Sequence, residues 1–180
     1  MIDTPIQAAY LTALGVFLPG DPIGNDEIEA HLGLVGGKPS RHRLRVLERN
    51  GIRTRHYALD RHGQRLHSNY EMASRAVINA VQRAGLDLGA VGYLSAATTL
   101  SDVLVPGFAS LVHGETRIPP CDIASYHGVC ASGVAALKGA FAQVRAGLVS
   151  TAVACASEFA SRHLRASVLE KSGLRNRHGS

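Results

Sequence analysis

Hydrophobic and polar positions along the chain switch repeatedly between the spacing of a strand and the spacing of a helix. Segments that are β-prone, or continuously apolar and small, and that end at Gly, Pro or polar clusters are typical of strands. We expect strands at residues 10–18, 91–99, 123–126 and 151–156, and an extended segment at 52–59.

Segments with apolar side chains at helical spacing alternate with these strands. Gly51 and Gly85 are positioned to end two of the helices, and Asn25 and Asn69 to begin two. We expect helices at residues 25–32, 41–50, 69–85, 106–116 and 130–146. The alternation of strands and helices predicts the α/β class, with helices layered on a mainly parallel sheet. No linker or repeat interrupts the chain, so residues 1–180 are interpreted as one domain.

Composition supports a folded globule, with 46% hydrophobic and 18% charged residues. No stretch approaches the ~20 apolar residues that a membrane span needs, and the N-terminus lacks the pattern of a signal peptide. The three cysteines, Cys121, Cys130 and Cys155, form no CxxC pair. An odd number without that spacing disfavours a disulfide framework or a metal site, so we expect a reducing, cytoplasmic location.

The net charge of +5 comes from one basic block. Residues 38–65 hold nine Lys and Arg against two acids, whereas residues 66–160 hold five bases against six acids. A basic patch attracts phosphate or an acidic protein surface, although a solvated helix face is the plainer interpretation. No nucleic-acid motif accompanies the block and aromatic residues are scarce, so we expect no nucleic-acid partner.

Cys130 is the candidate nucleophile. It follows a short strand and a glycine corner, and it stands where an apolar helix begins. Unsatisfied backbone N–H groups and the helix dipole favour a thiolate at such a position. The small neighbours Gly128, Ala131, Ser132 and Gly133 would admit a substrate carbonyl. The plainer interpretation is a buried cysteine that packs like a small hydrophobic residue.

Several stretches around this cysteine carry a family resemblance. They are the opening segment 10–19, Asn-Gly-Ile-Arg-Thr-Arg-His at 50–56, the segments 73–87 and 94–99, and the cysteine segment with its sequel at 149–158. In this order and spacing they resemble the N-terminal half of a β-ketoacyl-acyl-carrier-protein synthase III, a member of the thiolase superfamily. Residues 36–40 and 50–53 look most like the condensing enzymes that make dialkylresorcinols.

The resemblance implies a thiolase-like fold with a buried nucleophile helix, and it implies acyl transfer to Cys130 followed by decarboxylative C–C bond formation. The substrates would be acyl-coenzyme A or acyl-acyl-carrier-protein thioesters, with no tightly bound cofactor and no metal, in a homodimer. Arg49 corresponds to a phosphate-contacting arginine. Val105-Pro106 falls where the family projects an apolar residue across the dimer interface into the partner's acyl pocket, although a helix-start Pro with a core valine is the plainer interpretation. The family's adenine-stacking Trp is missing, because the chain has no Trp, and this favours a carrier-protein-bound donor. Glu158 is interpreted as structural.

Other interpretations stay open at this point. The family's catalytic His and Asn belong to its C-terminal half, and no matching segments follow in the chain. The sequence therefore leaves open whether these 180 residues act alone as an enzyme. If they do not act alone, the chain is a fragment, a truncated product, one half of a two-chain enzyme or a non-catalytic partner. His127 and His113 are the local candidates for a base, although surface histidines are the better interpretation. Acyl transfer to a hydroxyl or amine, and a cysteine hydrolase with an imperfect nucleophile elbow at 128–132, are the remaining alternatives.

Overall fold

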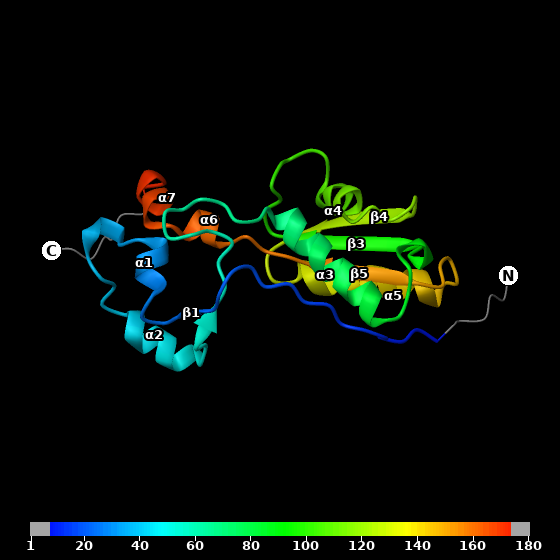
Figure 1. Cartoon of the computed structure of the whole chain (residues 1–180), viewed down its shortest axis with the longest axis horizontal. Helices are drawn as coiled ribbons and strands as arrows, with labels where there is room; N and C mark the ends of the chain where they lie inside the picture. Colours follow the sequence, from blue (N-terminus) through cyan, green and yellow to red (C-terminus); the bar gives the residue numbers. More distant parts are fainter. Residues whose placement is uncertain (1–7, 174–180) are drawn as a thin grey trace. The chain divides into compact units, whose positions relative to one another are not determined.

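The computed structural model describes residues 8–173, which form two compact units (Figure 1). The first unit comprises residues 8–17 and 68–158, and the second comprises residues 18–67 and 159–173. Each unit is described by itself below. The interpretation of residues 1–180 as one thiolase-like domain stays a prediction.

A three-stranded parallel sheet organises the first unit. Its order is β4-β3-β5, with β3 (Tyr93–Thr98) between β4 (Asp122–His127) and β5 (Ala152–Ala156). Tyr93 aligns with Asp122 on one side and with Ala152 on the other. Every residue of β3 is buried, as its continuously apolar or small sequence predicted. The expected parallel α/β arrangement is therefore confirmed.

Helices cover both faces of this sheet. Helices α3 (Asn69–Arg83) and α4 (Phe108–Thr116) pack on one face, where Leu94 joins their buried side chains in the main core. Helix α5 (Ser132–Arg145) packs on the other face, where the Ser95 hydroxyl donates to the Ala136 carbonyl at 2.9 Å. Alternation along β3 thus assigns successive side chains to opposite layers.

The start of α3 corrects one detail of the sequence prediction. Ser68, and not Asn69, caps the helix, because its hydroxyl accepts from the Glu71 N–H while the Glu71 carboxylate accepts from the Ser68 N–H. This reciprocal pair is a capping box. Asn69 is fully buried instead, and its amide donates to the Thr98 hydroxyl at 2.8 Å. Because Ser68 caps α3, the Asn69 side chain is available to hydrogen-bond Thr98 at the end of β3.

The strand expected at residues 10–18 is wrong. The segment joins neither described sheet, and it passes so close to α3 that a Cβ on Gly15 would collide with backbone atoms of Ala76 and Ala80. Leu14 and Val16 are 65% and 62% exposed. Side-chain pattern alone does not make a strand, because the ladder also requires a neighbour with unpaired N–H and C=O groups.

Helix α5 begins two residues later than expected, at Ser132 in place of Cys130. Its small side chains, Ser132, Ala136 and Ala140, are buried. The bulky apolar residues at helical spacing lie elsewhere on the helix, where Val134 and Phe141 are 70% and 52% exposed. The helix thus presents a slim face to the sheet and leaves apolar side chains uncovered within the described residues.

The second unit is built from short elements. Strand β1 (Ile23–Gly24) pairs antiparallel with β2 (Thr54–Arg55), which realises part of the extended segment expected at 52–59. Its helical elements are α1 (Ile28–Leu32), η1 (Val35–Gly37), α2 (Arg43–Asn50), α6 (Ser161–Leu164) and α7 (Ala166–Lys171). In neither unit does a described helix have the length and apolar character needed to cross a membrane.

Candidate functional site

Cys130 lies in the turn that connects β4 to α5. The strand ends at His127, Gly128 turns the chain at a φ of 155°, and the first helical residue is Ser132. The cysteine is exposed, and within residues 8–173 its sulfur has no hydrogen-bond or ion-pair partner. The position at the carboxyl end of a parallel strand is where α/β folds bind ligands. The interpretation of Cys130 as a buried packing residue does not fit this exposure.

Three hydrogen bonds define the turn around the cysteine. The buried Ser132 hydroxyl donates to the Val129 carbonyl at 3.2 Å, and the Ala135 N–H donates to the Ala131 carbonyl at 3.0 Å. On the strand side the Thr99 hydroxyl lies 3.4 Å from the Gly128 carbonyl oxygen. The backbone on both sides of Cys130 is therefore held by local contacts, whereas the cysteine itself is exposed.

The other two thiols have surroundings that suppress ionisation. Burial raises the pKa of Cys155, in β5, to about 12, although a backbone hydrogen bond with Ala97 acts in the opposite direction. Burial also raises the pKa of Cys121, and the neighbouring Asp122 charge adds to that effect. Since the thiolate is the nucleophilic form, both residues are poor nucleophiles near neutral pH.

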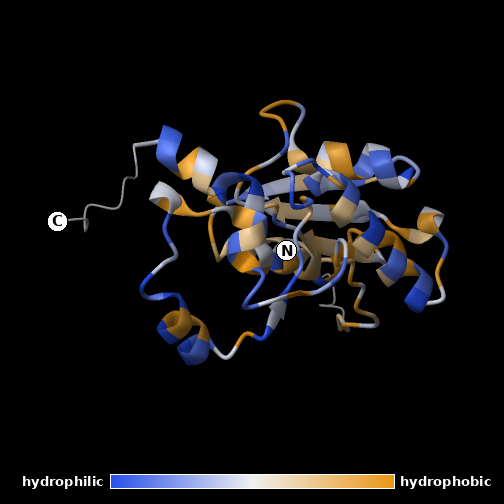
Figure 2. Cartoon of the chain, turned by 60° about the vertical axis from the view of Figure 1, so that its left-hand side comes forward, coloured by the Kyte–Doolittle hydropathy of each residue, from blue (hydrophilic) through white to orange (hydrophobic). Residues whose placement is uncertain are grey.

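Val105 and Pro106, assigned to the acyl pocket by the resemblance, lie in the loop between β3 and α4. Both are exposed, Val105 by 80%, and the apolar colour of this loop is visible at the top of Figure 2. Because β3 and β4 are parallel, this loop and the Cys130 turn leave the same edge of the sheet. The described residues do not close a pocket around Val105, so its role in an acyl pocket stays a prediction.

Arg49 lies in the last turn of α2, in the second unit, and its side chain is exposed. Two other arginines of the basic block are engaged, with Arg43 paired to Glu29 at 2.7 Å and Arg61 paired to Glu27 at 2.8 Å. Neither of these two ion pairs of the described residues involves Arg49. A phosphate-binding role for Arg49 is compatible with its exposure and stays a prediction.

The two candidate histidine bases are also placed. His127 is the last residue of β4 and is exposed, and His113, in α4, has Nε2 3.3 Å from the Pro119 carbonyl oxygen. Because a carbonyl oxygen only accepts, His113 Nε2 is the donor in this hydrogen bond. Neither ring hydrogen-bonds the Cys130 sulfur in the described part of the chain. Surface histidines remain the better interpretation of both.

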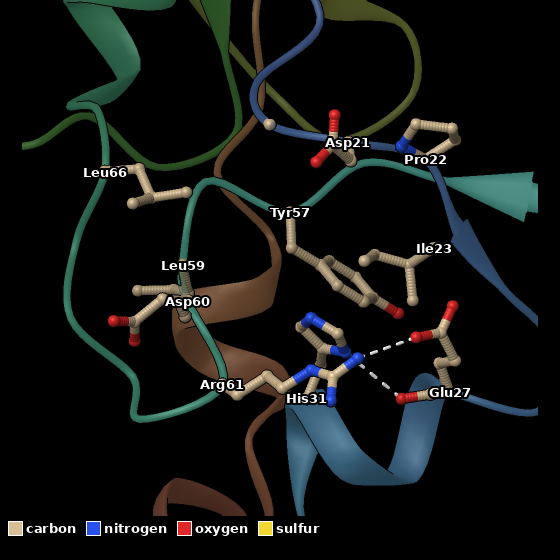
Figure 3. Close-up of a pocket in the computed structure, with 11 residues that line it drawn as sticks. Asp21, Pro22, Ile23, Glu27, His31, Tyr57, Leu59, Asp60, Arg61 and Leu66 are labelled. Atoms are coloured by element: carbon tan, nitrogen blue, oxygen red, sulfur yellow. Dashed lines mark hydrogen bonds and ion pairs between the residues drawn. The ribbon is translucent and has the colours of Figure 1, made fainter.

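A cavity of about 410 Å³ lies in the second unit (Figure 3). Its wall includes the buried His31, whose Nδ1 lies 3.2 Å from the Glu27 carbonyl oxygen, and the Glu27–Arg61 ion pair. Burial raises the pKa of Tyr57, which also lines the cavity. None of the predicted site residues belongs to this wall. Across residues 8–173, no cluster of three or more His, Cys, Asp or Glu is placed to hold a metal ion.

Sequence reasoning gave Thr99 no role and Glu158 only a structural one, although the two side chains contact each other beside the Cys130 turn. Thr99 follows β3 and Glu158 follows β5, and their side chains meet at the carboxyl edge of the sheet. The sequence contained a signal for this pair, because each is a polar residue within two positions of the end of a parallel strand, where the side chains of neighbouring parallel strands meet.

Comparison with known proteins identifies the class of fold. No protein-family model matches the chain. Its structure is similar to that of β-ketoacyl-acyl-carrier-protein synthase III from Thermus thermophilus, with a TM-score of 0.67 and 25% identity over 86% of this chain and 44% of that one. It is also similar to a tetronic acid condensing enzyme, with a TM-score of 0.63 and 25% identity over 74% and 40% of the two chains. The fold is thus thiolase-like.

Among curated proteins, the β-ketoacyl-acyl-carrier-protein synthase III of Bordetella petrii is 31% identical over 163 residues, which are 91% of this chain and 48% of the relative. The chain spans about half the length of the curated relatives that it matches. The resemblance to the N-terminal half of the β-ketoacyl-acyl-carrier-protein synthase III family is therefore confirmed.

Proposed function

We propose that this chain carries the nucleophile of an acyl-thioester condensing enzyme, and that Cys130 is that nucleophile. The observation that carries the proposal is the exposed thiol in the turn between β4 and α5, in a chain similar to β-ketoacyl-acyl-carrier-protein synthase III over nine tenths of its length. The two other cysteines support it by contrast, since burial raises the pKa of each.

The chemistry begins with acyl transfer to sulfur. The Cys130 thiolate attacks the thioester carbonyl, the carbonyl oxygen takes the negative charge, and collapse of the tetrahedral species expels the donor thiolate. The Cys130 N–H can donate to that oxygen because the helical hydrogen bonds of α5 do not use it, which is the role of an oxyanion-hole donor. The products are the acyl-enzyme and a free donor thiol.

The second step forms the C–C bond. A malonyl thioester loses carbon dioxide, and the resulting carbanion attacks the acyl-enzyme carbonyl and displaces the Cys130 thiolate. The resemblance assigns the His and Asn that assist this step to the half of the relatives outside the matched region. For the 180-residue chain by itself we therefore expect a single acylation and no repeated turnover.

The donor thioester is proposed to arrive on an acyl carrier protein or on coenzyme A. Support for the carrier protein comes from α2 and its flanks, where Arg41, Arg45, Arg49 and Arg53 are exposed and belong to neither described ion pair. Such a cluster suits an acidic protein or a phosphopantetheine phosphate. A cytoplasmic homodimer in fatty-acid or polyketide biosynthesis is part of the same proposal.

The test is incubation of the purified 180-residue chain with acyl-coenzyme A or an acyl carrier protein thioester, read by intact mass and peptide mapping. We expect one acyl group on Cys130 and none in Cys130→Ala, while Cys121→Ala and Cys155→Ala remain acylated. Acylation that maps to Cys121 or Cys155 contradicts the assignment. Transfer onward to a hydroxyl or amine, with no ketoacyl product after malonyl thioester is added, would favour an ester- or amide-forming acyltransferase.

A further inference from the structure

Thr99 and Glu158 join the ends of two strands beside the Cys130 turn. The Thr99 N–H donates to Glu158 Oε1 at 2.7 Å, and the Thr99 hydroxyl lies 2.8 Å from the same oxygen. Thr99 directly follows β3, and Glu158 lies two residues after β5. The Ser157 N–H donates to the Ala97 carbonyl at 3.1 Å, so the strand pairing extends to the residue before Glu158.

The same hydroxyl reaches the third strand. Thr99 Oγ1 lies 3.4 Å from the carbonyl oxygen of Gly128, the residue at which β4 turns toward Cys130. A hydroxyl has one hydrogen, and the shorter distance assigns it mainly to the Glu158 carboxylate. Because Glu158 also accepts from the Thr99 N–H, it fixes both the backbone and the rotamer of Thr99 against the Gly128 peptide.

We propose that Thr99 and Glu158 are positioning residues for Cys130: the carboxylate fixes the backbone and rotamer of the threonine, and the threonine side chain held in this way lies against the Gly128 peptide from which the nucleophile turn starts. The inference rests on the proposed function, because it assigns these residues a purpose for the nucleophile. The interpretation of Glu158 as merely structural is thereby extended. Ser132, which donates to Val129, secures the opposite side of the turn.

The physical reason is the precision that acyl transfer demands. The thiol and the N–H of Cys130 must both face one carbonyl group, and reactive groups need placement within about 0.5 Å. Cys130 is exposed, so the geometry of its turn depends on what holds the two ends: the Thr99 side chain against Gly128 at one end, and the Ser132 hydrogen bond to Val129 at the other.

The experiment measures the rate of Cys130 alkylation by iodoacetamide across pH, resolved by peptide mass spectrometry, in the full 180-residue chain. Thr99→Val removes the hydroxyl and keeps the shape, Thr99→Ser keeps the hydroxyl, and Glu158→Gln removes the charge. Glu170→Gln is the matched control, because Glu170 also accepts a backbone N–H, that of Gly36 at 2.7 Å, within the second unit.

We expect Thr99→Val and Glu158→Gln to slow Cys130 alkylation at neutral pH by ~5-fold or more and to displace its pH profile, because alkylation depends on the surroundings of the thiol. Thr99→Ser should rescue both readouts, and Glu170→Gln should match the unaltered chain. Alkylation of Cys121 should not change in any variant. This pattern would separate positioning of Cys130 from a general loss of structure.

Unchanged rates and profiles in both test variants would overturn the inference, as would equal losses in Thr99→Ser and Thr99→Val. Loss of the circular-dichroism spectrum in both would also overturn it, since the pair would then be structural. If only Thr99→Val loses its fold, the alkylation rate and pH profile of Glu158→Gln test the inference, and unchanged values in that variant would overturn it. Absence of acylation in the unaltered chain, with altered alkylation in the variants, would reject the proposed function and leave the positioning role intact.

Discussion

The hydroxyls of Tyr93 and Tyr126 lie 3.5 Å apart on the face of the sheet that α5 covers. Tyr93 begins β3 and Tyr126 is the fifth residue of β4. Gly139 of α5 lies directly over them, since a Cβ at this glycine would stand 3.2 Å from the Tyr93 hydroxyl and would collide with that of Tyr126. The tyrosine pair therefore sets how closely the helix that follows Cys130 can approach the sheet.

Gly139→Ala is expected to destabilise the chain by about 1–2 kcal/mol net, because the added methyl group forces either the tyrosines or α5 to shift and this cost exceeds the gain in helix propensity. Gly114→Ala in α4 is the control, since a Cβ there meets no atom within 4 Å. That substitution should stabilise the protein by about 0.5–1 kcal/mol through helix propensity. Urea unfolding followed by circular dichroism measures both, and a shift of the two midpoints in the same direction would contradict the packing argument.

Stability should fall in alkaline solution. Burial raises the pKa of Cys155 from 9.0 to about 12, and burial, the Tyr126 hydrogen bond and nearby negative charge raise that of Tyr93 from 10.0 to about 12. Both groups hold their protons more tightly in the folded state, so their contribution is complete below pH 9 and is lost as the pH rises toward 12.

The free energy of unfolding should fall by at most about 1.4 kcal/mol per pH unit for each of the two groups. The free energy of unfolding at each pH is measured by urea titration. Cys155→Ala should reduce its decline above about pH 9, and Tyr93→Phe should reduce its decline above about pH 10. A stability that stays constant from pH 8 to pH 11 would refute this linkage.

The basic surface of the second unit should bind an acidic carrier protein. We expect the combined reversal of Arg41, Arg45 and Arg49 to Glu to weaken that binding by ~10-fold or more at ~0.1 M salt, where charges act over ~10 Å. Arg43 is left intact, because it pairs with Glu29 and its loss would disturb the unit itself.

Surface plasmon resonance with immobilised acyl carrier protein measures the binding of this variant. Reversal of Arg83 on α3 is the control, because this exposed arginine belongs to the first unit. Equal affinities for all three proteins, or tight sequence-selective DNA binding by the unaltered chain, would count against a carrier-protein surface.

The uncovered apolar side chains of α5 should make the 180-residue chain associate. Val134, Leu137 and Phe141 are 70%, 51% and 52% exposed, and such a cluster marks an interaction surface. Leu137→Ser combined with Phe141→Ser should lower self-association in sedimentation velocity. Val46→Ser, at a 56% exposed position of α2, is the control. A monomeric unaltered chain would contradict this expectation.

Local sequence signals were sufficient for much of the fold. The continuously apolar or small segment 91–99 predicted a fully buried strand, and β3 is buried throughout. Gly51 was expected to end a helix, and it adopts the left-handed conformation just after α2. These features depend on propensities of a few adjacent residues, which a sequence displays directly.

Features that depend on distant partners were not accessible in the same way. The segment 10–18 has the side chains of a strand, yet it forms none, because no described strand offers it a ladder. The helix that follows Cys130 was expected from its periodicity, but only its contact with Tyr126 explains why Gly139 must be small.

The sequence by itself determined that a cysteine with small neighbours stands between a strand and a helix, because that order is local. The tertiary structure decided which residues surround it. Thr99 and Glu158 lie 59 positions apart, and they meet at the Cys130 turn only because β4, β3 and β5 align in parallel and end at one edge. A hydrogen bond between such residues arises from strand order and register, which no local pattern encodes.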